Sequence, residues 1–124
     1  MSKEKSEQRR PAGRWRGCLG VAAALLLAGC AAKTAFTEGQ ELLAAEQVDA
    51  GLARIKDAIA LEPSSAEYRI AYARALDRDV NANLAIAERA LIELRHATAE
   101  NAYQRVLVLQ PGNERALAVH DLVV

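Results

Sequence analysis

Apolar and polar positions after residue 35 follow the period of an α-helix. Leu52, Ile55, Ala58 and Ile59 recur at intervals that place them on one face of a helix. This pattern continues to the end of the chain. Alanine is abundant and aromatic residues make up only 4% of the sequence, which suits close packing of helices rather than a sheet. The sequence therefore predicts an all-α fold.

Residues that break or cap helices divide this pattern into about five helices, one of them long. The interruptions fall at residues 47–49, 63–65, 79–83, 96–98 and 111–113. We expect Asp49 to cap the second helix and Pro63 to end it, because proline disfavours a helical residue before it.

The long helix is predicted from Ser65 to about His96. Ser64 is its expected N-cap, and Glu67 would complete a capping box by reaching back. Residues 79–83 are the place at which this helix would bend or break.

Residues 1–29 have a different pattern, with a basic head, an apolar core and small residues at the end. The apolar run covers residues 18–28 and is broken only by Gly20. About a dozen residues is the length of a signal-peptide core, whereas a helix that spans a bilayer needs roughly 20. These three parts in this order are typical of a secretory signal.

The four residues Leu27-Ala28-Gly29-Cys30 resemble the lipobox of bacterial lipoproteins. The resemblance implies cleavage before Cys30 and attachment of three acyl chains, such as palmitate, to that residue. Stable anchoring takes more than one chain, so three would hold the protein on a membrane. Ala31 follows the cysteine, which by the same resemblance favours the outer membrane and a periplasm-facing domain.

The lipobox divides the chain into three parts. Residues 1–29 are the expected signal peptide, 30–34 the lipidated cysteine with a short tether, and 35–124 the helical domain. Two other interpretations remain open: an ordinary signal peptide with a chance cysteine, and an uncleaved apolar anchor.

Charge and cysteine content narrow the function classes of the mature part. Residues 30–124 carry ten basic and fourteen acidic side chains, for a net charge near −4. A mildly acidic domain without a basic patch argues against nucleic-acid binding. Cys18 would leave with the signal peptide and Cys30 would be lipidated, so no disulfide framework is possible.

The helical region resembles the tetratricopeptide repeat, a pair of antiparallel helices of about 34 residues. The positions of the family pattern are occupied here by Ala35, Glu38, Gly39, Leu42, Gly51, Ile55 and Pro63, of which Gly39, Gly51 and Pro63 are the strong matches. The resemblance implies that Gly39 and Gly51 lie where the two helices cross closely. Ala35 and Glu38 depart from the family pattern, so the first helix is expected to pack less deeply than usual.

The same design returns in the second half of the chain. Ala99, Tyr103, Val106, Leu107 and Pro111 stand in register with Gly51, Ile55, Ala58, Ile59 and Pro63. After Pro111, residues 114–123 are predicted to form a last helix that covers the open end of the repeat stack. We expect Leu117 and Leu122 of this helix to face back onto the repeat.

No residue pattern for catalysis, metal binding or cofactor binding is evident. His96 and His120 are isolated, with no cysteine or second histidine at ligand spacing. The run 77–79 is interpreted as a solvated charged face. Tyr68 and Tyr72 lie four residues apart on one helical face and, like Tyr103, are interpreted as packing residues. We therefore expect no enzyme activity, no metal and no cofactor.

Repeat helices without catalytic groups usually bind proteins along a concave surface. The segments Ala66-Glu67-Tyr68-Arg69 and 103–116 further resemble a leader found in some secretins of type II secretion and type IV pilus systems. That resemblance implies an envelope scaffold with secretion or pilus subunits as partners. The alternatives are a general adaptor in outer-membrane or cell-wall assembly, and a truncated secretin-like fragment.

Overall fold

The computed structural model describes residues 14–123, together with the side chains of residues 27–119 and of Leu122. Its helices are α1 (Arg14–Ala44), α2 (Val48–Leu61), α3 (Ala66–Ile92), α4 (His96–Leu109) and α5 (Glu114–Val123). No strand occurs in this part of the chain. The predicted all-α fold of about five helices, one of them long, is confirmed.

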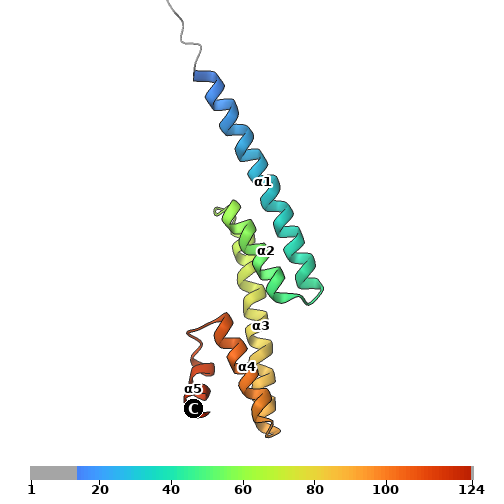
Figure 1. The fold of residues 1–124 in the computed structure, drawn as a ribbon, viewed down its shortest axis with the longest axis vertical. Coiled ribbons are helices and arrows are strands. Elements are labelled where there is room, and N and C mark those ends of the chain that lie inside the picture. Colours follow the sequence, from blue (N-terminus) through green and yellow to red (C-terminus); the bar gives the residue numbers. More distant parts are fainter. Residues whose placement is uncertain (1–13, 124) are drawn as a thin grey trace, which may run out of the picture.

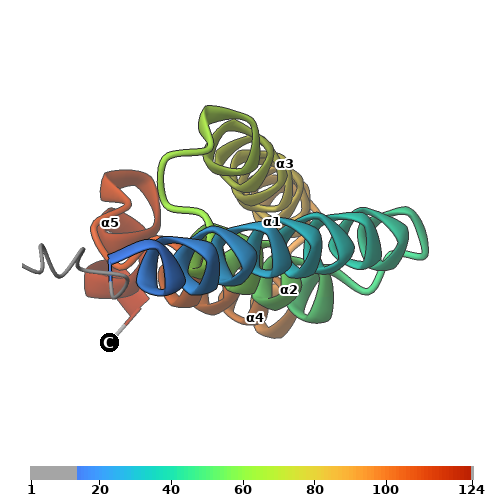
Figure 2. The ribbon, with the colours of Figure 1, turned by 90° about the horizontal axis from the view of Figure 1, so that it is seen from above.

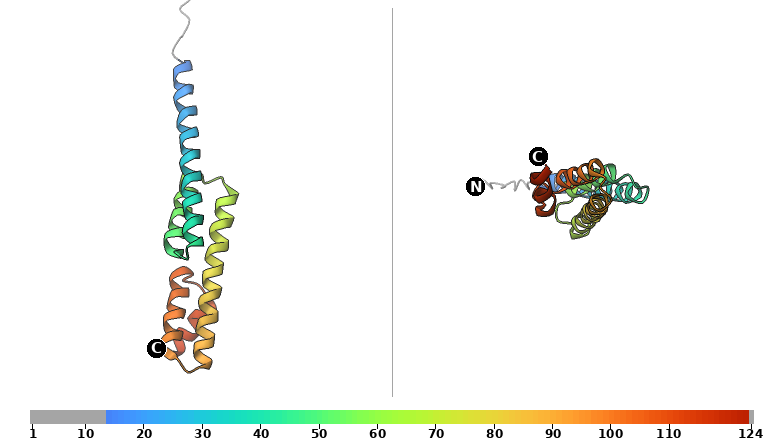
Figure 3. Two further views of the ribbon diagram at one scale, coloured as in Figure 1. Left: turned by 90° about the vertical axis from the view of Figure 1, so that its right-hand side faces the viewer. Right: turned by 90° about the horizontal axis from the view of Figure 1, so that it is seen from below.

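Helix α3 is the spine of the molecule, and the other helices pack along its two halves (Figure 1). The α1/α2 hairpin lies beside the first half of α3, as the view from above also shows (Figure 2). Helix α4 runs antiparallel to the second half of α3, and α5 packs on α4 (Figure 3). The first half of α1 extends beyond the other helices.

The backbone contains an internal repeat. Helices α2 and α4 each have 14 residues, and they begin at Val48 and His96. The helix before each ends in a left-handed residue, Glu46 with φ 60° and Leu94 with φ 57°. The next N–H groups, of Gln47 and Arg95, donate to carbonyls five residues earlier at 2.9 and 2.8 Å. Both helix ends are therefore Schellman motifs.

We call residues 30–75 the first unit and residues 78–123, which repeat it, the second unit. Positions in the two units are equivalent when they are offset as Val48 is from His96. The last helix of each unit is capped at an equivalent residue. Ser65 Oγ accepts from the N–H three residues later at 3.4 Å, and Asn113 Oδ1 does the same at 3.1 Å. The second half of α3 is thus the structural equivalent of the second half of α1.

Each unit has its own apolar core. The buried residues of the first core are Ala32, Ala35, Phe36, Ile55, Ala58 and Tyr68. Within it the rings of Phe36 and Tyr68 lie 4.5 Å apart between centroids and tilt by 33°. The buried residues of the second core are Val80, Leu84, Ala87, Ala90, Ala99, Ala102, Tyr103, Val106 and Ala116. Burial of these apolar surfaces is the main force that holds the helices together.

Helices α1 and α2 cross at Gly39 and Gly51, which are both buried. A Cβ at Gly39 would lie 2.7 Å from Ile55 Cγ1 and 3.0 Å from the carbonyl oxygen of Gly51. A Cβ at Gly51 would lie 2.7 Å from Leu43 Cγ. Only glycine leaves room for this approach, because no side chain separates the two backbones.

The first helix differs from its predicted form. α1 runs without a break through residues 30–34, where the sequence suggests a short tether, and Ala32 is fully buried there. The apolar positions Ala32, Ala35 and Phe36 face the first core, so the helical pattern starts before residue 35. Burial of these side chains in the first core favours a helical conformation in this turn.

Helix α3 is continuous through residues 79–83, where the sequence suggests a bend or break. The side-chain amide of Asn83 donates to the backbone carbonyl and to Oδ1 of Asp79, at 2.9 and 3.1 Å. These polar groups are satisfied inside the helix, and the neighbouring Val80 and Leu84 are buried in the second core. The actual break falls at residues 93–95, slightly before the predicted one at 96–98.

Three local predictions need correction. The N-cap of α3 is Ser65 rather than Ser64, and the N-cap of α2 is Gln47 rather than Asp49, with no side-chain cap bond. On α5, which has the predicted bounds, Leu117 and Leu122 are both exposed, so the expectation that they face the repeat is wrong. The residue that faces the core there is Ala116, in the position equivalent to Tyr68.

Candidate functional site

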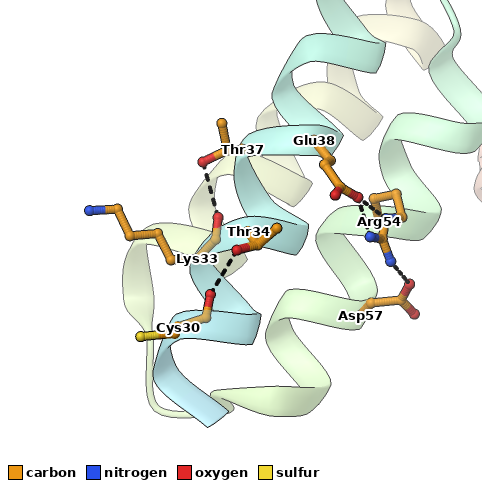
Figure 4. Close-up of polar contacts among 7 residues, drawn as sticks. All are labelled: Cys30, Lys33, Thr34, Thr37, Glu38, Arg54 and Asp57. Carbon is orange, nitrogen blue, oxygen red and sulfur yellow. Dashed lines mark hydrogen bonds and ion pairs between the residues drawn. The ribbon is translucent and has the colours of Figure 1, made fainter. Parts of the chain in front are cut away.

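Cys30 lies on the exposed side of α1 and has no disulfide partner (Figure 4). Its sulfur points away from α2 in the close-up. Thr34 Oγ1 donates to the Cys30 carbonyl and Thr37 Oγ1 to the Lys33 carbonyl, each at 3.0 Å. Together with Glu38, these four residues line a shallow hollow of about 440 Å³. The thiol is therefore reachable from solvent.

The Cys30 end of α1 is fixed to α2 by a cluster of charged side chains further along the helix. Arg54 of α2 donates from Nε to Glu38 Oε2 at 2.8 Å and from Nη1 to Asp57 Oδ2 at 3.2 Å (Figure 4). Hydrogen bonds to the Glu38 carboxylate, and then to Asp57, raise the pKa of the Arg54 guanidinium. This cluster is solvent-exposed, so it orients the helices more than it stabilises them.

A groove of about 340 Å³ opens between α1, α2 and α3. It is lined by Gln40, Leu43, Ala44, Ile55, Ala71, Arg74, Ala75 and Arg78. Arg74 and Arg78 stand one turn apart on α3, and neither forms an ion pair with a carboxylate of the described residues. The groove therefore combines an apolar floor with two available positive charges.

The two units are joined by one arginine of α4. Arg105 Nη2 lies 2.7 Å from Asp49 Oδ1 of α2 and 2.7 Å from Asp79 Oδ2 of α3. Hydrogen bonds to these carboxylates, with Asp49 the larger effect, raise the pKa of the Arg105 guanidinium. Asp79 is largely buried in this pair, so the interpretation of residues 77–79 as a solvated face is wrong for Asp79.

The structure places most of the predicted repeat positions in the cores. Gly39, Gly51, Ile55, Ala58, Ala99, Tyr103 and Val106 are buried, and Leu42 is half-buried. Pro63 and Pro111 are exposed in the loops that follow α2 and α4. These residues shape the scaffold rather than a binding surface.

The residues considered for chemistry lie apart from one another. His96 is exposed at the first position of α4, and the side chain of His120 lies outside the described residues. Tyr68 stacks on Phe36, Tyr72 packs half-buried against the first core, and Tyr103 is buried in the second. The described part of the chain brings no three metal-ligating side chains together.

Sequence reasoning did not single out Arg105, the groove arginines or the second-core residues of α3. The second-core residues of α3 could have been found from the internal repeat of the sequence. Val80, Leu84 and Ala87 stand in register with Ala32, Phe36 and Gly39. The roles of the arginines could not be found in this way, because they depend on which helices lie next to each other in the fold.

Comparison of the chain with protein-family models, with curated proteins and with solved structures finds no match in any of the three. Among the described residues, no helix has both the length and the apolar character needed to cross a membrane. The function of this chain is therefore inferred from its residues and their arrangement.

Proposed function

We propose that the protein is a lipid-anchored scaffold of the bacterial cell envelope that binds another protein in the groove between α1 and α3. Cys30 carries the lipid after cleavage of the Gly29–Cys30 bond, and the domain faces the periplasm, in an arrangement typical of outer-membrane lipoproteins. The lipobox residues and the exposed position of the Cys30 thiol support this anchor.

The proposed scaffold is a pair of tetratricopeptide-like hairpins. The close crossing at Gly39 and Gly51, the equivalent hairpins of the two units and the shared helix α3 support this assignment. Stacked hairpins of this kind present a concave surface to protein partners. The proposed setting is a type II secretion or pilus-like apparatus, because residues 66–69 and 103–116 are similar to secretin leaders.

The observation that carries the binding proposal is the groove itself. Arg74 and Arg78 are charged at every physiological pH and stand over an apolar floor that includes Leu43 and Ile55. Guanidinium groups beside apolar surface are enriched at protein interfaces, because they combine hydrogen bonds with stacking. No reacting group lies in the groove, so binding rather than chemistry is the function that it suits.

The anchor is tested by the intact mass of the protein from a native bacterial membrane. The expected product begins at Cys30 and carries three acyl chains, and Cys30→Ser should abolish both the cleavage and the lipid. An unlipidated native product would remove the anchor from the proposal.

The groove is tested by pull-down from the same detergent extract with the Arg74→Ala/Arg78→Ala variant. Capture of a secretion or pilus subunit should fall by about tenfold or more, since two interface arginines are lost. Lys56→Ala, which removes one exposed positive charge from α2, is the control and should capture normally. Equal capture by all three proteins would exclude the groove as the binding site.

A further inference from the structure

One exposed side of the second half of α3 is unusually apolar. It comprises Ala82, Ala85, Ile86, Arg89, Ile92 and, on the following turn, Leu94, which together we call the second-unit face. Ile86 is about half exposed, and Ile92 and Leu94 are 84% and 75% exposed. Single exposed apolar residues are normal, but three of them within residues 86–94, two on α3 and one just after it, are unusual.

The internal repeat provides a control for this observation. The equivalent residues of the first unit occupy the same side of α1: Thr34, Thr37, Glu38, Glu41, Ala44 and Glu46. On the same backbone, three glutamates of the first unit are thus replaced by Ile86, Arg89 and Leu94. At Ile92 and Leu94 the hairpin needs no large apolar residue, because the equivalent Ala44 and Glu46 of the first unit are exposed. Position 86 differs, since the equivalent Glu38 pairs with Arg54 of α2. Ile92 and Leu94 therefore have a cause other than the fold.

Leu94 strengthens this argument. It has φ 57°, a left-handed conformation that glycine adopts freely and that branched side chains disfavour. Its side chain is also exposed, so it gains little from burial in return. The equivalent Glu46 has the same left-handed conformation, so what distinguishes Leu94 is its exposed apolar side chain.

Glu93 also lies beside these apolar residues, but it is paired with Arg95, so the net charge there is positive. Ala85, Ile86, Arg89 and Arg95 line a hollow of about 200 Å³. Arg95 donates from Nε to Glu93 Oε2, two residues away, at 2.7 Å. Arg89 forms no ion pair with any carboxylate of the described residues. A partner that covers Ile86 and Ile92 would therefore gain from an acidic group placed opposite Arg89.

We propose that the second-unit face docks an amphipathic helix of a partner protein, with apolar residues over Ile86, Ile92 and Leu94 and an acidic residue against Arg89. Alanines at positions 82 and 85 let the backbone of such a helix come close to α3. A helix suits this face because α3 has no free backbone groups in its middle with which an extended strand could pair. A second copy that paired through the same face would bring two positively charged faces together, which disfavours it.

This surface lies outside the α1/α3 groove, so the proposal extends the proposed function and fails independently of it. The test measures fluorescence anisotropy of labelled peptides with the full chain in detergent. The probe is a helical peptide of about 20 residues with leucines on one face and glutamates beside them. A second peptide has lysine in place of each glutamate.

We expect the acidic peptide to bind about tenfold more tightly than the basic one, because only the first can pair with Arg89. The decisive variant carries the first unit's residues: Ile86→Glu, Arg89→Glu, Ile92→Ala and Leu94→Glu. These residues occur on the same backbone in the first unit, so the variant should keep its helix content, checked by circular dichroism. Its affinity for the acidic peptide should fall by about tenfold or more.

Lys56→Ala, which removes one exposed positive charge from α2 outside both surfaces, is the matched control and should bind the acidic peptide as the unchanged protein does. No binding of the acidic peptide, equal binding of both peptides, or full affinity in the decisive variant would overturn the proposal. Two further outcomes would overturn the partner helix and indicate a different binding partner for this face. Binding to phosphatidylglycerol vesicles that is lost in the variant would indicate a membrane, and a dimer lost in the variant would indicate a second copy.

Discussion

The two units share one backbone design but fill it with different side chains. In the first unit Ile55 on α2 faces Tyr68 on α3, whereas in the second unit Tyr103 on α4 faces Ala116 on α5. The tyrosine lies on the third helix of the first unit but on the second helix of the second unit. The residue opposite it is Ile55 in the first unit and the smaller Ala116 in the second. What the fold requires at these sites is the summed volume, since a core tolerates exchanges that keep the packing density.

The largest expected effect comes from breaking this exchange in the second unit. Tyr103→Ile should leave a void beside Ala116 and lower the free energy of unfolding by about 2–4 kcal/mol. Adding Ala116→Tyr recreates the arrangement of the first unit and should recover at least about 1 kcal/mol, because the two sites share one volume. Denaturant unfolding of the two single variants and the double variant measures the coupling. Strictly additive losses would show that the units are not interchangeable.

A second comparison concerns the helix crossings. Gly39→Ala should cost about 2 kcal/mol, because its Cβ would lie 2.7 Å from Ile55 Cγ1 and 3.0 Å from the backbone of Gly51. The equivalent Ala87 is already accommodated in the second unit, and Ala87→Gly should cost about 1 kcal/mol through helix propensity. Thermal melts of both variants measure these two losses of stability. A stabilised Gly39→Ala protein would mean that α1 and α2 separate easily.

The two arginine clusters should differ in their importance. Arg105→Ala leaves the largely buried Asp79 without its charged partner and should lower stability by about 1–2 kcal/mol. Arg54→Ala breaks only exposed pairs and should leave the melting temperature almost unchanged. Hydrogen exchange should also show faster opening between the units in the Arg105 variant. Equal effects of both variants would argue against Arg105 as the joint.

Glycine at the left-handed residues that follow α1 and α3 should stabilise the protein. Leu94→Gly and Glu46→Gly should each raise the free energy of unfolding by up to about 1 kcal/mol, because glycine adopts positive φ without steric strain. Denaturant midpoints of the two variants provide the measurement. If only the Leu94 variant also loses the acidic peptide, the Leu94 side chain contributes to binding.

The smallest effect is a pH dependence at alkaline pH. Burial, and then the nearby Glu88, raises the pKa of Tyr103 above its ordinary value of 10.0, and burial also raises the pKa of Tyr68. The folded protein therefore keeps a proton that the unfolded chain loses. This contribution to stability is complete below about pH 10 and declines as the pH rises above it. Tyr103→Phe should flatten the decline in thermal melts between about pH 9 and 11.

The sequence predicts those features of the fold that depend on local pattern. Pro63 and Pro111 mark helix ends, and the apolar stripe at Ile55 and Ala58 identifies the buried side of α2. The predicted break at residues 79–83 is wrong because Asn83 and Asp79 satisfy each other within the helix. The groove and the Arg105 joint depend on contacts between distant segments, which no local pattern encodes.

Helix α3 belongs to both units, since its first half closes one core and its second half opens the next. In most repeat arrays each unit has its own helices, and the ends can fray while the rest stays folded. Here, loss of either core exposes one half of a continuous rod of 27 residues, about 40 Å long. The rod couples the two cores mechanically, so the domain should unfold in a single cooperative transition. A force applied near Cys30 would be transmitted along this rod to the tip at Leu94.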